Sequence, residues 1–221
     1  MTLTQSTWES FAASQKPLTG IKIGVIDIGL GNIGSVTRML SLLGAVVLID
    51  SSPDLCLRTN KLILPGVGSY DCGVNQLLKT GWFHELKRLD YQQFSLLGIC
   101  LGMQLLCESS EEGMNYGLGL IPGHFTKIST SIPQRKSSLH VGWNSTIFPI
   151  HSPLSNLSSS ERYYFIHSYW LKSTHPGFIL SETNYYSPFV SGVYNSGCIG
   201  VQFHPEKSRD YGMKLLCSIF L

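Results

Sequence analysis

The stretch "LLGICLGMQLL", residues 96–106, decides the fold of this chain. An apolar run of β-strand type leads directly into a helical pattern, and Cys100 stands at the junction, between Gly98 and Gly102. The pattern G-x-C-x-G is the cysteine form of the nucleophile elbow, a strained strand-to-helix turn that pushes its central side chain outward. The amides of the following helix favour a thiolate at this position. The alternative is a structural cysteine buried between two glycines.

Strands and helices alternate through the first half of the chain, which predicts a parallel sheet with helices on both faces. The second half consists of short β-branched and aromatic runs between Gly, Pro, Ser and Asn turns, which predicts antiparallel hairpins and one strand that returns to the main sheet. The expected fold class is therefore α/β, an open and mostly parallel sheet flanked by helices, with added antiparallel hairpins in the C-terminal half. The predicted strands are 21–28, 45–50, 61–66, 94–99, 124–128, 163–172, 188–195 and 198–204, and the predicted helices are 33–43, 74–89 with an interruption at Gly81, 101–110 and 211–221.

The composition bounds the protein class. The 221 residues, 43% of them hydrophobic, are enough for one sizeable core, so one domain is expected ahead of two. A formal net charge of +2 without a basic run does not indicate nucleic-acid binding, and the apolar runs are far shorter than the roughly 20 residues that span a bilayer. Residues 1–20 are polar and lack the pattern of a secretory signal, so we expect a loosely ordered N-terminal extension before a domain over 21–221.

Six cysteines are present without a C-x-x-C pair or a regular framework. In a chain of this size without a signal they favour reduced thiols and a cytoplasmic protein. The histidines and acids lack the spacing of metal ligands, so no metal site is expected.

A thiol nucleophile requires a base, and the base requires an orienting acid. Of seven histidines, only His204 lies in "VQFHPEKS", two residues before Glu206. On a strand the two side chains would point to the same face, with Cα atoms about 6 to 7 Å apart. Glu206 would then hold one imidazole nitrogen and leave the other for Cys100. The alternative is an exposed His-Pro-Glu turn.

The loop "LPGVG", residues 64–68, is a candidate for the oxyanion-binding part of the site. Pro and two glycines after a strand make a tight turn whose amides, at Gly66 and Val67, can point toward an oxyanion. The amide of Leu101, directly after the nucleophile, is the usual second donor in an elbow. Taken alone, the P-G-V-G pattern indicates only a turn.

The stretch "IKIGVIDIGLGNIG", residues 21–34, raises a different possibility. Its glycines fit G-x-G-x-x-G, and Asp50 stands at the position of the acidic residue that binds the ribose in a dinucleotide-binding unit. Asp27, however, occupies a position that is usually apolar in such units. A dinucleotide-binding module is therefore an alternative function, and a strand-end or cap role is the alternative for Asp50.

The order of these motifs, with H-P-E about 100 residues after G-I-C-L-G and both after a P-G-x-G loop, resembles the class I (triad-type) glutamine amidotransferases. The resemblance runs from residue 21 to the C-terminus and implies their flavodoxin-like fold, without a cofactor. Finer stretches resemble the branch that forms the glutaminase subunit of imidazole glycerol phosphate synthase in histidine biosynthesis. These stretches are "GLGNIGSV", "LPGVGSYD", "GICLGMQLLCESSEEG", "GLGLIPG", "HVGWN", "YFIHSYW" and "VQFHPEKS".

The resemblance implies hydrolysis of glutamine to glutamate and ammonia through a cysteine thioester. It also implies a heterodimer in which a (β/α)8-barrel cyclase subunit receives the ammonia. The implied catalytic residues are Cys100, His204 and Glu206; the oxyanion donors lie at Gly66, Val67 and Leu101; the glutamine-binding residues are Gln104, Glu112, His167, Ser168 and Tyr169; and the partner-interface residues are Asn32, Trp143 and Lys207.

Each implied residue outside the triad also has a structural interpretation. Gln104 fits a polar helix face, Glu112 a solvated acid and His167 a structural histidine. Asn32, Trp143 and Lys207 fit a helix cap, a core aromatic and a surface lysine.

Some positions depart from the family pattern. Leu139 stands where proline often precedes "HxGWN", "SYDCG" after P-G-V-G is unusual, and the 20-residue extension is extra. Two further enzyme functions therefore stay open: a paralogous subunit that feeds ammonia to a sugar-modifying synthetase of surface-polysaccharide biosynthesis, and a stand-alone γ-glutamyl hydrolase.

Overall fold

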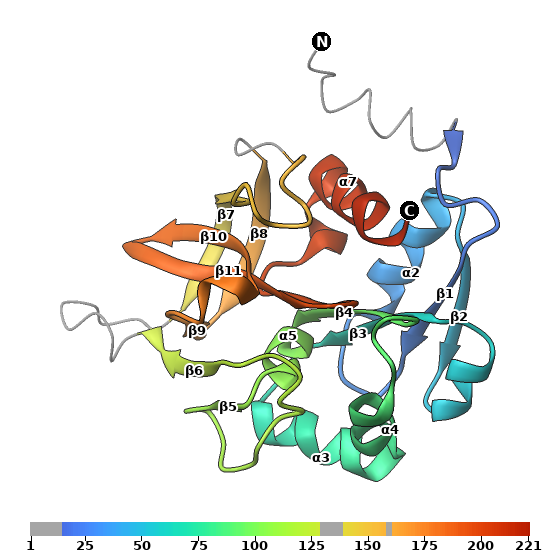
Figure 1. Cartoon of the computed structure of the whole chain (residues 1–221), viewed down its shortest axis with the longest axis horizontal. Coiled ribbons are helices and arrows are strands. Elements are labelled where there is room, and N and C mark those ends of the chain that lie inside the picture. Colours follow the sequence, from blue (N-terminus) through green and yellow to red (C-terminus); the bar gives the residue numbers. More distant parts are fainter. Residues whose placement is uncertain (1–14, 129–138, 158–160) are drawn as a thin grey trace.

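The computed structural model describes residues 15–128, 139–157 and 161–221, which fold around one large twisted sheet (Figure 1). The elements in chain order are β1 (Lys22–Ile26), α2 (Ile33–Leu42), β2 (Val46–Asp50), the 3₁₀ helix η1 (Pro53–Leu57), β3 (Lys61–Gly66), α3 (Tyr70–Thr80), α4 (Trp82–Arg88), β4 (Ser95–Cys100), α5 (Leu101–Leu106), β5 (Ser109–Ser110), β6 (His124–Lys127), β7 (His140–Ile147), β8 (Arg162–His167), β9 (Tyr169–Leu171), η2 (Pro176–Phe178), β10 (Ile179–Tyr185), β11 (Ser187–Asn195), β12 (Cys198–Val201), η3 (Pro205–Lys207) and α7 (Arg209–Phe220).

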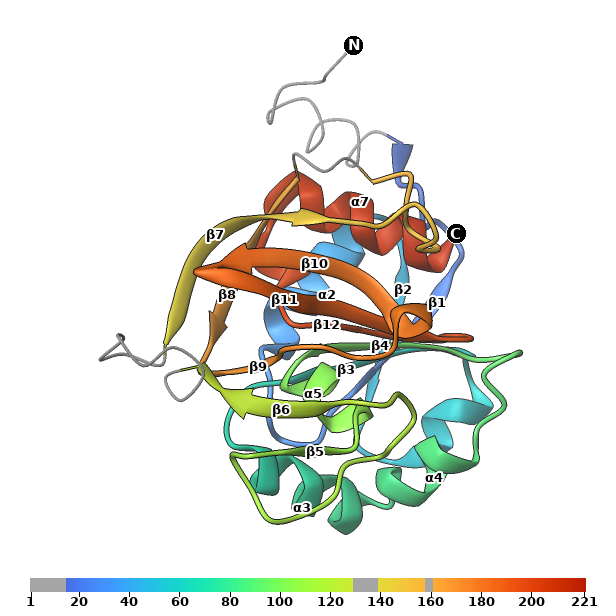
Figure 2. The same cartoon turned by 60° about the vertical axis from the view of Figure 1, so that its left-hand side comes forward.

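The sheet has the order β2-β1-β3-β4-β12-β11-β10-β7-β8 within the described residues. Strands β2, β1, β3, β4 and β12 are parallel to one another, and β11, β10, β7 and β8 continue the sheet in antiparallel pairs that begin with β12 and β11. The predicted α/β class is therefore confirmed, and β12 is the predicted strand that returns to the main sheet. Figure 2 shows the hairpin strands curving away from the parallel part.

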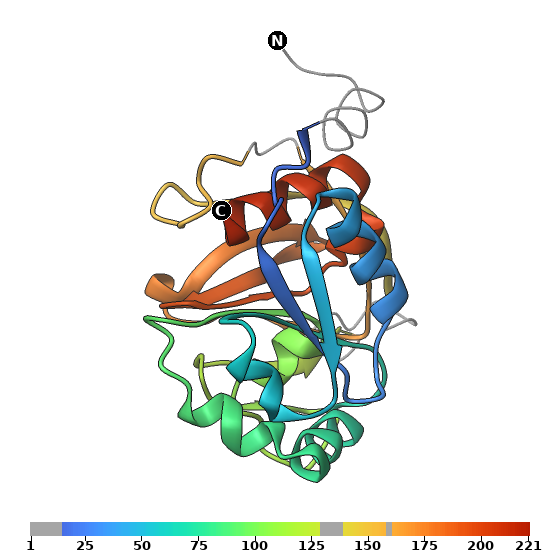
Figure 3. The ribbon, with the colours of Figure 1, turned by 90° about the vertical axis from the view of Figure 1, so that its right-hand side faces the viewer.

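Helices cover both faces of the parallel half, as the alternating pattern predicts. Helices α2 and α7 lie on one face, and α3, α4 and α5 lie on the other (Figure 3). Strand β3 shows why the sheet is a buried central layer: Ile63 packs with the α2 side, while Leu62 and Leu64 pack with the opposite side. No helix in the described part of the chain is long and apolar enough to cross a membrane.

Several boundaries differ from the sequence-based expectations. The helix expected over 74–89 begins earlier, at Tyr70. The predicted interruption at Gly81 is confirmed, because its φ of 82° ends α3 in the left-handed region. The helix expected over 101–110 ends at Leu106. Strands β7 and β10 were not predicted as strands, because polar side chains interrupt their apolar alternation.

The N-terminal extension is described only from residue 15, so the expectation for residues 1–14 lies outside the described residues. Leu18 is fully buried, and its amide donates a hydrogen bond of 2.8 Å to the carbonyl of Leu43. The end of the extension therefore packs on the core beside α2.

The start of α5 lies in direct contact with β3. A Cβ added at Gly102 would stand 2.0 Å from the carbonyl oxygen of Leu64, whereas one added at Gly34 in α2 would meet nothing within 4 Å. We therefore expect Gly102→Ala to lower the free energy of unfolding by about 3 kcal/mol, because backbone rather than a flexible side chain must move. Gly34→Ala, the matched control, should raise it by up to about 1 kcal/mol. Urea unfolding measures both, and equal stabilities would contradict this account of the elbow.

Candidate active site

The carboxyl ends of parallel strands bring the predicted motifs to one edge of the sheet. Cys100 ends β4, and Gly66, at the end of β3, is its register partner. Strand β12 pairs with the other side of β4, and the chain beyond it carries His204. The elbow, the P-G-V-G loop and the H-P-E segment thus lie side by side, although they are far apart in the sequence.

Cys100 has the strained backbone of a nucleophile elbow. Its φ of 55° and ψ of −108° are unfavourable for a residue with a Cβ, and it directly precedes the first residue of α5. Gly98 and Gly102 permit the turn, since a Cβ added at Gly98 would stand 2.8 Å from the Gly102 carbonyl oxygen. The side chain is only 7% exposed, and it lines a cavity rather than the core alone.

His204 and Glu206 form a buried pair. The His204 Nδ1 lies 2.7 Å from Glu206 Oε1, so Nδ1–H donates to the carboxylate. Burial on its own lowers the pKa of His204, but interactions with Cys100 and Glu206 outweigh it and raise that pKa above its ordinary value. Nε2 is buried and has no hydrogen-bond partner among the described residues, which leaves this nitrogen for the thiol and a substrate.

His204 and Glu206 do not share a strand face, and Pro205 between them fits the end of a strand. Strand β12 ends at Val201, and Pro205–Lys207 form the 3₁₀ helix η3. Proline cannot extend the ladder, so the chain turns at His204 and brings the carboxylate back toward the imidazole. The expected contact forms through this turn and not through a shared strand face.

A cavity of about 340 Å³ opens in front of Cys100, within the size range of small-molecule sites. It contains nearly all of the predicted catalytic and glutamine-binding side chains. Gly66 and Glu206 are not among its lining residues. Its lining residues are Val67, Gly68, Cys100, Leu101, Gln104, Glu112, Leu139, Ile166, His167, Ser168, Tyr169, His204 and Lys207.

Glu112 and Gln104 are held in place at this cavity. The Glu112 carboxylate accepts a hydrogen bond of 3.0 Å from the backbone amide of Tyr70, at the start of α3. Burial raises the pKa of Glu112, an effect that the Tyr70 amide opposes and the charge of Asp71 reinforces. Gln104 is 5% exposed, and its Nε2 lies 3.2 Å from the side-chain oxygen of Gln202. Neither is a freely solvated surface side chain.

His167 belongs to a buried histidine pair that the sequence analysis did not identify. Its Nδ1 lies 2.8 Å from the carbonyl oxygen of Tyr169, and its Nε2 lies 2.8 Å from Nδ1 of His140. Because the carbonyl can only accept, His167 donates from Nδ1 and accepts at Nε2 from His140. Burial lowers the pKa of His167 to about 4, and the charge of His204 adds to that effect. His167 is therefore neutral in this wall of the cavity.

Gln202 is a second residue that the sequence analysis missed. It is fully buried, and its Nε2 lies 3.6 Å from Sγ of Cys100. The available signal was its position two residues before His204, which predicts that both side chains point toward the same region. Among the described residues, no group of three His, Cys, Asp or Glu side chains is arranged to hold a metal ion.

The expected partner-interface residues occupy three settings. Lys207 lines the cavity, with its Nζ 5.6 Å from the ring centre of Tyr164. Asn32 caps α2 by accepting a hydrogen bond of 3.3 Å from the Ser35 amide, and Trp143 is half-buried on β7. Asn32 and Trp143 do not line the active-site cavity, so only Lys207 joins it directly.

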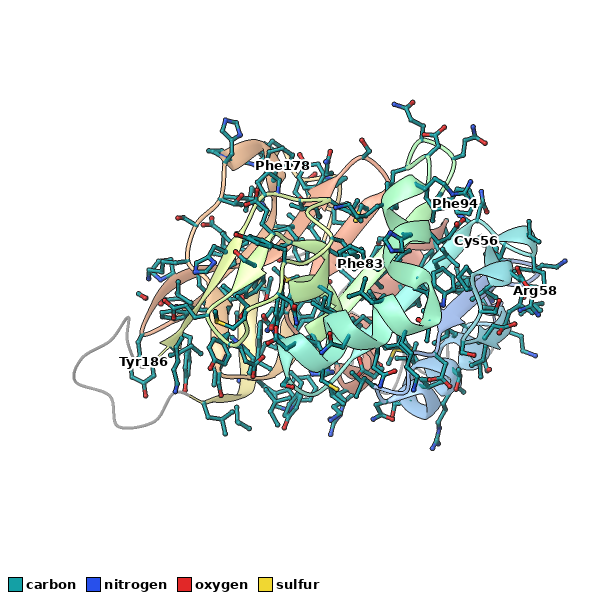
Figure 4. The ribbon with its side chains drawn as sticks, turned by 90° about the horizontal axis from the view of Figure 1, so that it is seen from below. Cys56, Arg58, Phe83, Phe94, Phe178 and Tyr186 are labelled. Carbon is teal, nitrogen blue, oxygen red and sulfur yellow. The ribbon has the colours of Figure 1, made fainter. Side chains whose placement is uncertain are left out.

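The glycine-rich turn after β1 supports the neighbouring loop. A Cβ at Gly31 would stand 3.2 Å from the carbonyl oxygen of Pro65, so the glycine permits close packing against the P-G-V-G loop. Asp50 forms an ion pair with Arg58 and accepts from the Ser52 amide at 2.9 Å. Figure 4 shows Arg58 at the end of the molecule opposite Tyr186. These contacts agree with the interpretation of Asp50 as a strand-end residue.

A family model described as glutamine amidotransferase class-I matches residues 24–220. The chain belongs to this family. Among curated relatives, an imidazole glycerol phosphate synthase subunit HisH 2 of Methanococcus maripaludis is 43% identical over 196 residues, 88% of this chain and 96% of the relative. The subunit HisH of Bdellovibrio bacteriovorus is 37% identical over 198 residues, 88% and 97% of the two chains.

Solved structures share the fold at lower identity. The structure of PurLQS from Thermotoga maritima matches with a TM-score of 0.68 and 18% identity, over 90% of this chain and 97% of that one. A crystal structure of a glutamine amidotransferase matches with a TM-score of 0.66 and 17% identity, over 88% and 96%. The amidotransferase fold is thus shared well beyond close relatives.

The two histidines of the cavity should shift the pH dependence of stability in opposite directions. The pKa of His167 falls from 6.5 to about 4 on folding, so the unfolded chain alone binds a proton as the pH drops from 6.5 toward 4. Stability should fall by about 3 kcal/mol across that window, and His167→Asn should remove this slope. The pKa of His204 rises to about 10, so its contribution is present below pH 6.5 and lost as the pH rises toward 10.

His204→Asn, the matched control, should therefore change only the alkaline limb. Urea unfolding at a series of pH values measures both limbs. An acid slope that persists in the His167→Asn variant would contradict the assignment of His167.

Proposed function

We propose that this amidotransferase is the glutaminase subunit of an imidazole glycerol phosphate synthase, acting in histidine biosynthesis. The observation that carries the proposal is that one cavity joins Cys100, His204 with its partner Glu206 behind it in hydrogen-bond contact, and the expected glutamine-binding side chains. The curated relatives of this chain carry that synthase-subunit name over nearly their whole length. The proposed enzyme domain covers residues 21–221, and Leu18 just before it packs beside α2.

Glutamine first transfers its acyl group to Cys100. The thiolate attacks the side-chain amide carbon, and the carbonyl electron pair moves onto oxygen, for which the amides near Val67 and Leu101 are the proposed donors. His204 Nε2–H then gives its proton to the nitrogen as the C–N bond breaks. Ammonia leaves, and a γ-glutamyl thioester remains on Cys100.

Water completes the reaction. It attacks the thioester carbon while His204 Nε2 takes its proton, and the C–S bond breaks to release glutamate and the thiolate. Glu206 accepts from Nδ1–H throughout, so it holds the imidazole orientation and stabilises the cationic ring. Burial of both side chains strengthens that interaction.

The cavity offers polar side chains that can bind the amino-acid end of glutamine. The Glu112 carboxylate is suited to the α-ammonium group, and the Gln104 amide has further hydrogen-bonding capacity beyond its contact with Gln202. The segment His167–Tyr169 supplies the facing backbone, which the histidine pair holds rigid. These contacts fix the amide carbon next to Cys100.

A partner surface surrounds the cavity mouth. Val67, Leu139 and Ile166 line the cavity and leave apolar side chains partly exposed there. Beside them, a groove between α2, η3 and the start of α7 is lined by Arg38, Lys207 and Arg209 together with Glu206, whose carboxylate pairs with His204. No carboxylate of the described residues forms an ion pair with these three cations. An apolar rim with unpaired cations fits a synthase subunit that presents acidic side chains. We propose a (β/α)8-barrel cyclase for this subunit, contacting Asn32, Trp143 and Lys207.

The proposed compartment is the cytoplasm. All six cysteines are free, and four of them are buried. Such a thiol content suits a reducing compartment.

The catalytic assignment is tested by trapping and by turnover. A glutamine-like electrophile such as diazo-oxo-norleucine should form one adduct, on Cys100, as located by mass spectrometry. His204→Ala should lower turnover about 10² to 10⁴-fold because the proton carrier is lost, and Glu206→Gln should lower it less. An adduct on Cys107 or Cys198, or near-normal turnover of the His204→Ala variant, would reject the assignment.

Partner dependence tests the pathway. The glycine-flanked peptide of the P-G-V-G loop can rest in either orientation, and we expect its amide to point away from the oxyanion in the isolated chain. The isolated chain should therefore hydrolyse glutamine slowly, and a cyclase with its bound acceptor should stimulate it at least about 10²-fold, since the loss of one oxyanion donor costs about that much. Glutamate release is measured for the chain alone, with the cyclase, and with cyclase plus a product analogue.

Each other function predicts a distinct result in that assay. Full activity of the isolated chain would indicate a stand-alone hydrolase. Stimulation only by a sugar-modifying synthetase would keep the mechanism and replace the pathway.

A further inference from the structure

Two buried glutamines link the substrate cavity to the nucleophile. Gln104 lies on α5 and lines the cavity, whereas Gln202 follows β12 and is fully buried. The Gln104 Nε2 lies 3.2 Å from Gln202 Oε1, and the Gln202 Nε2 lies 3.6 Å from Cys100 Sγ. The three side chains therefore form a continuous row that ends on the reacting sulfur.

The first contact sets the direction of the second. An amide nitrogen only donates and an amide oxygen only accepts, so the Gln104 Nε2–H donates to Gln202 Oε1. This bond turns the Gln202 Nε2–H toward Cys100. The reversed amide would place the Gln202 oxygen beside the sulfur, where it would repel a thiolate.

Cys100 Sγ has one neighbour that suits the neutral thiol and another that suits the thiolate. A protonated thiol has the Ile166 carbonyl oxygen 3.9 Å away as an acceptor. A thiolate cannot donate to that carbonyl and instead requires donors, and a hydrogen bond to a charged group is stronger than one to a neutral group. Gln202 offers such a donor without a proton that it can lose, so it supports the thiolate in either protonation state of His204.

We propose that Gln202 is a catalytic residue that stabilises the Cys100 thiolate through its side-chain N–H, with Gln104 as the positioning residue that fixes the direction of its amide. Gln104 also lines the substrate cavity, so a glutamine that engages it reinforces the same orientation. The proposal rests on the assigned role of Cys100 as nucleophile. It adds a neutral donor to the cation supplied by His204.

Alkylation of Cys100 by iodoacetamide tests this inference without glutamine or a partner. The full-length chain is alkylated over a range of pH, and peptide mass spectrometry follows Cys100 together with the exposed Cys72 as an internal reference. Gln202→Met keeps the length of the side chain and removes the donor. It should slow Cys100 alkylation about tenfold at neutral pH, as expected for one lost hydrogen bond to a charged group.

The pH dependence separates loss of the donor from a change in packing. At alkaline pH, where free thiols ionise without help, the Gln202→Met variant should react at the unaltered rate. The other titratable side chains around the cavity are the same in both proteins, namely Glu112, His167, Tyr169, His204 and Lys207. Gln92→Met, at an exposed glutamine, is the matched control and should leave every rate unchanged.

Gln104→Met provides a second test that keeps Gln202. It should slow alkylation of Cys100 about threefold at neutral pH, because the Gln202 amide then samples both orientations. Alkylation of the buried Cys107 and Cys198 would show that Gln202→Met unfolds the chain. In that case the Gln104→Met variant decides whether the proposal holds.

Unchanged reactivity of Cys100 in folded Gln202→Met would overturn the proposal. Equal slowing at every pH would also overturn it, since that indicates altered access. A failure of the glutaminase assignment would be recognised separately, by absence of glutamate release with normal thiol reactivity.

Discussion

The close contact between the start of α5 and the end of β3 is the constraint on which the site depends. Gly102 lies against the Leu64 carbonyl so tightly that no Cβ fits, and Cys100 must then turn through a positive φ to join the strand to the helix. The strain of that turn is offset by the packing of Leu62 and Leu64 with the helices on their face of the sheet. The same turn lifts the thiol out of the core and aims it at the cavity.

Two histidines of one cavity show how hydrogen-bond partners decide charge. His204 and His167 are both buried, and burial favours the neutral ring in each. His204 interacts with the Glu206 carboxylate and the Cys100 sulfur, and these interactions outweigh burial. His167 has the Tyr169 carbonyl and the His140 ring as partners instead, and there burial prevails. The cavity thus holds a cationic imidazole at the place where a proton is transferred and a neutral imidazole beside it.

The sequence predicts those features that depend on local pattern. Strand β3 matches its apolar run residue for residue, and the elbow at Cys100 follows from two glycines and a change of period. Strands β7 and β10 were not predicted because their polar side chains pair within the sheet, as the hydroxyl groups of Thr146 and Thr183 do at 2.9 Å. The contact between Gln202 and Cys100 is invisible for a related reason: 102 residues separate the two side chains, and only strand pairing brings them together. Long-range polar contacts leave no periodic signal.

The glycine-rich turn after β1 illustrates why a motif does not determine a function. In a dinucleotide-binding unit, glycines allow a phosphate to approach the backbone. Here Gly31 allows the carbonyl of Pro65 to approach instead, and the space is taken by the neighbouring loop. Asp27 accepts a hydrogen bond of 2.8 Å from the Gly29 amide, which closes the turn on itself. The freedom of glycine is used in both cases for close packing, but the packed group here is the backbone of the P-G-V-G loop. Support of that loop from behind connects the first strand of the sheet to the chemistry at Cys100.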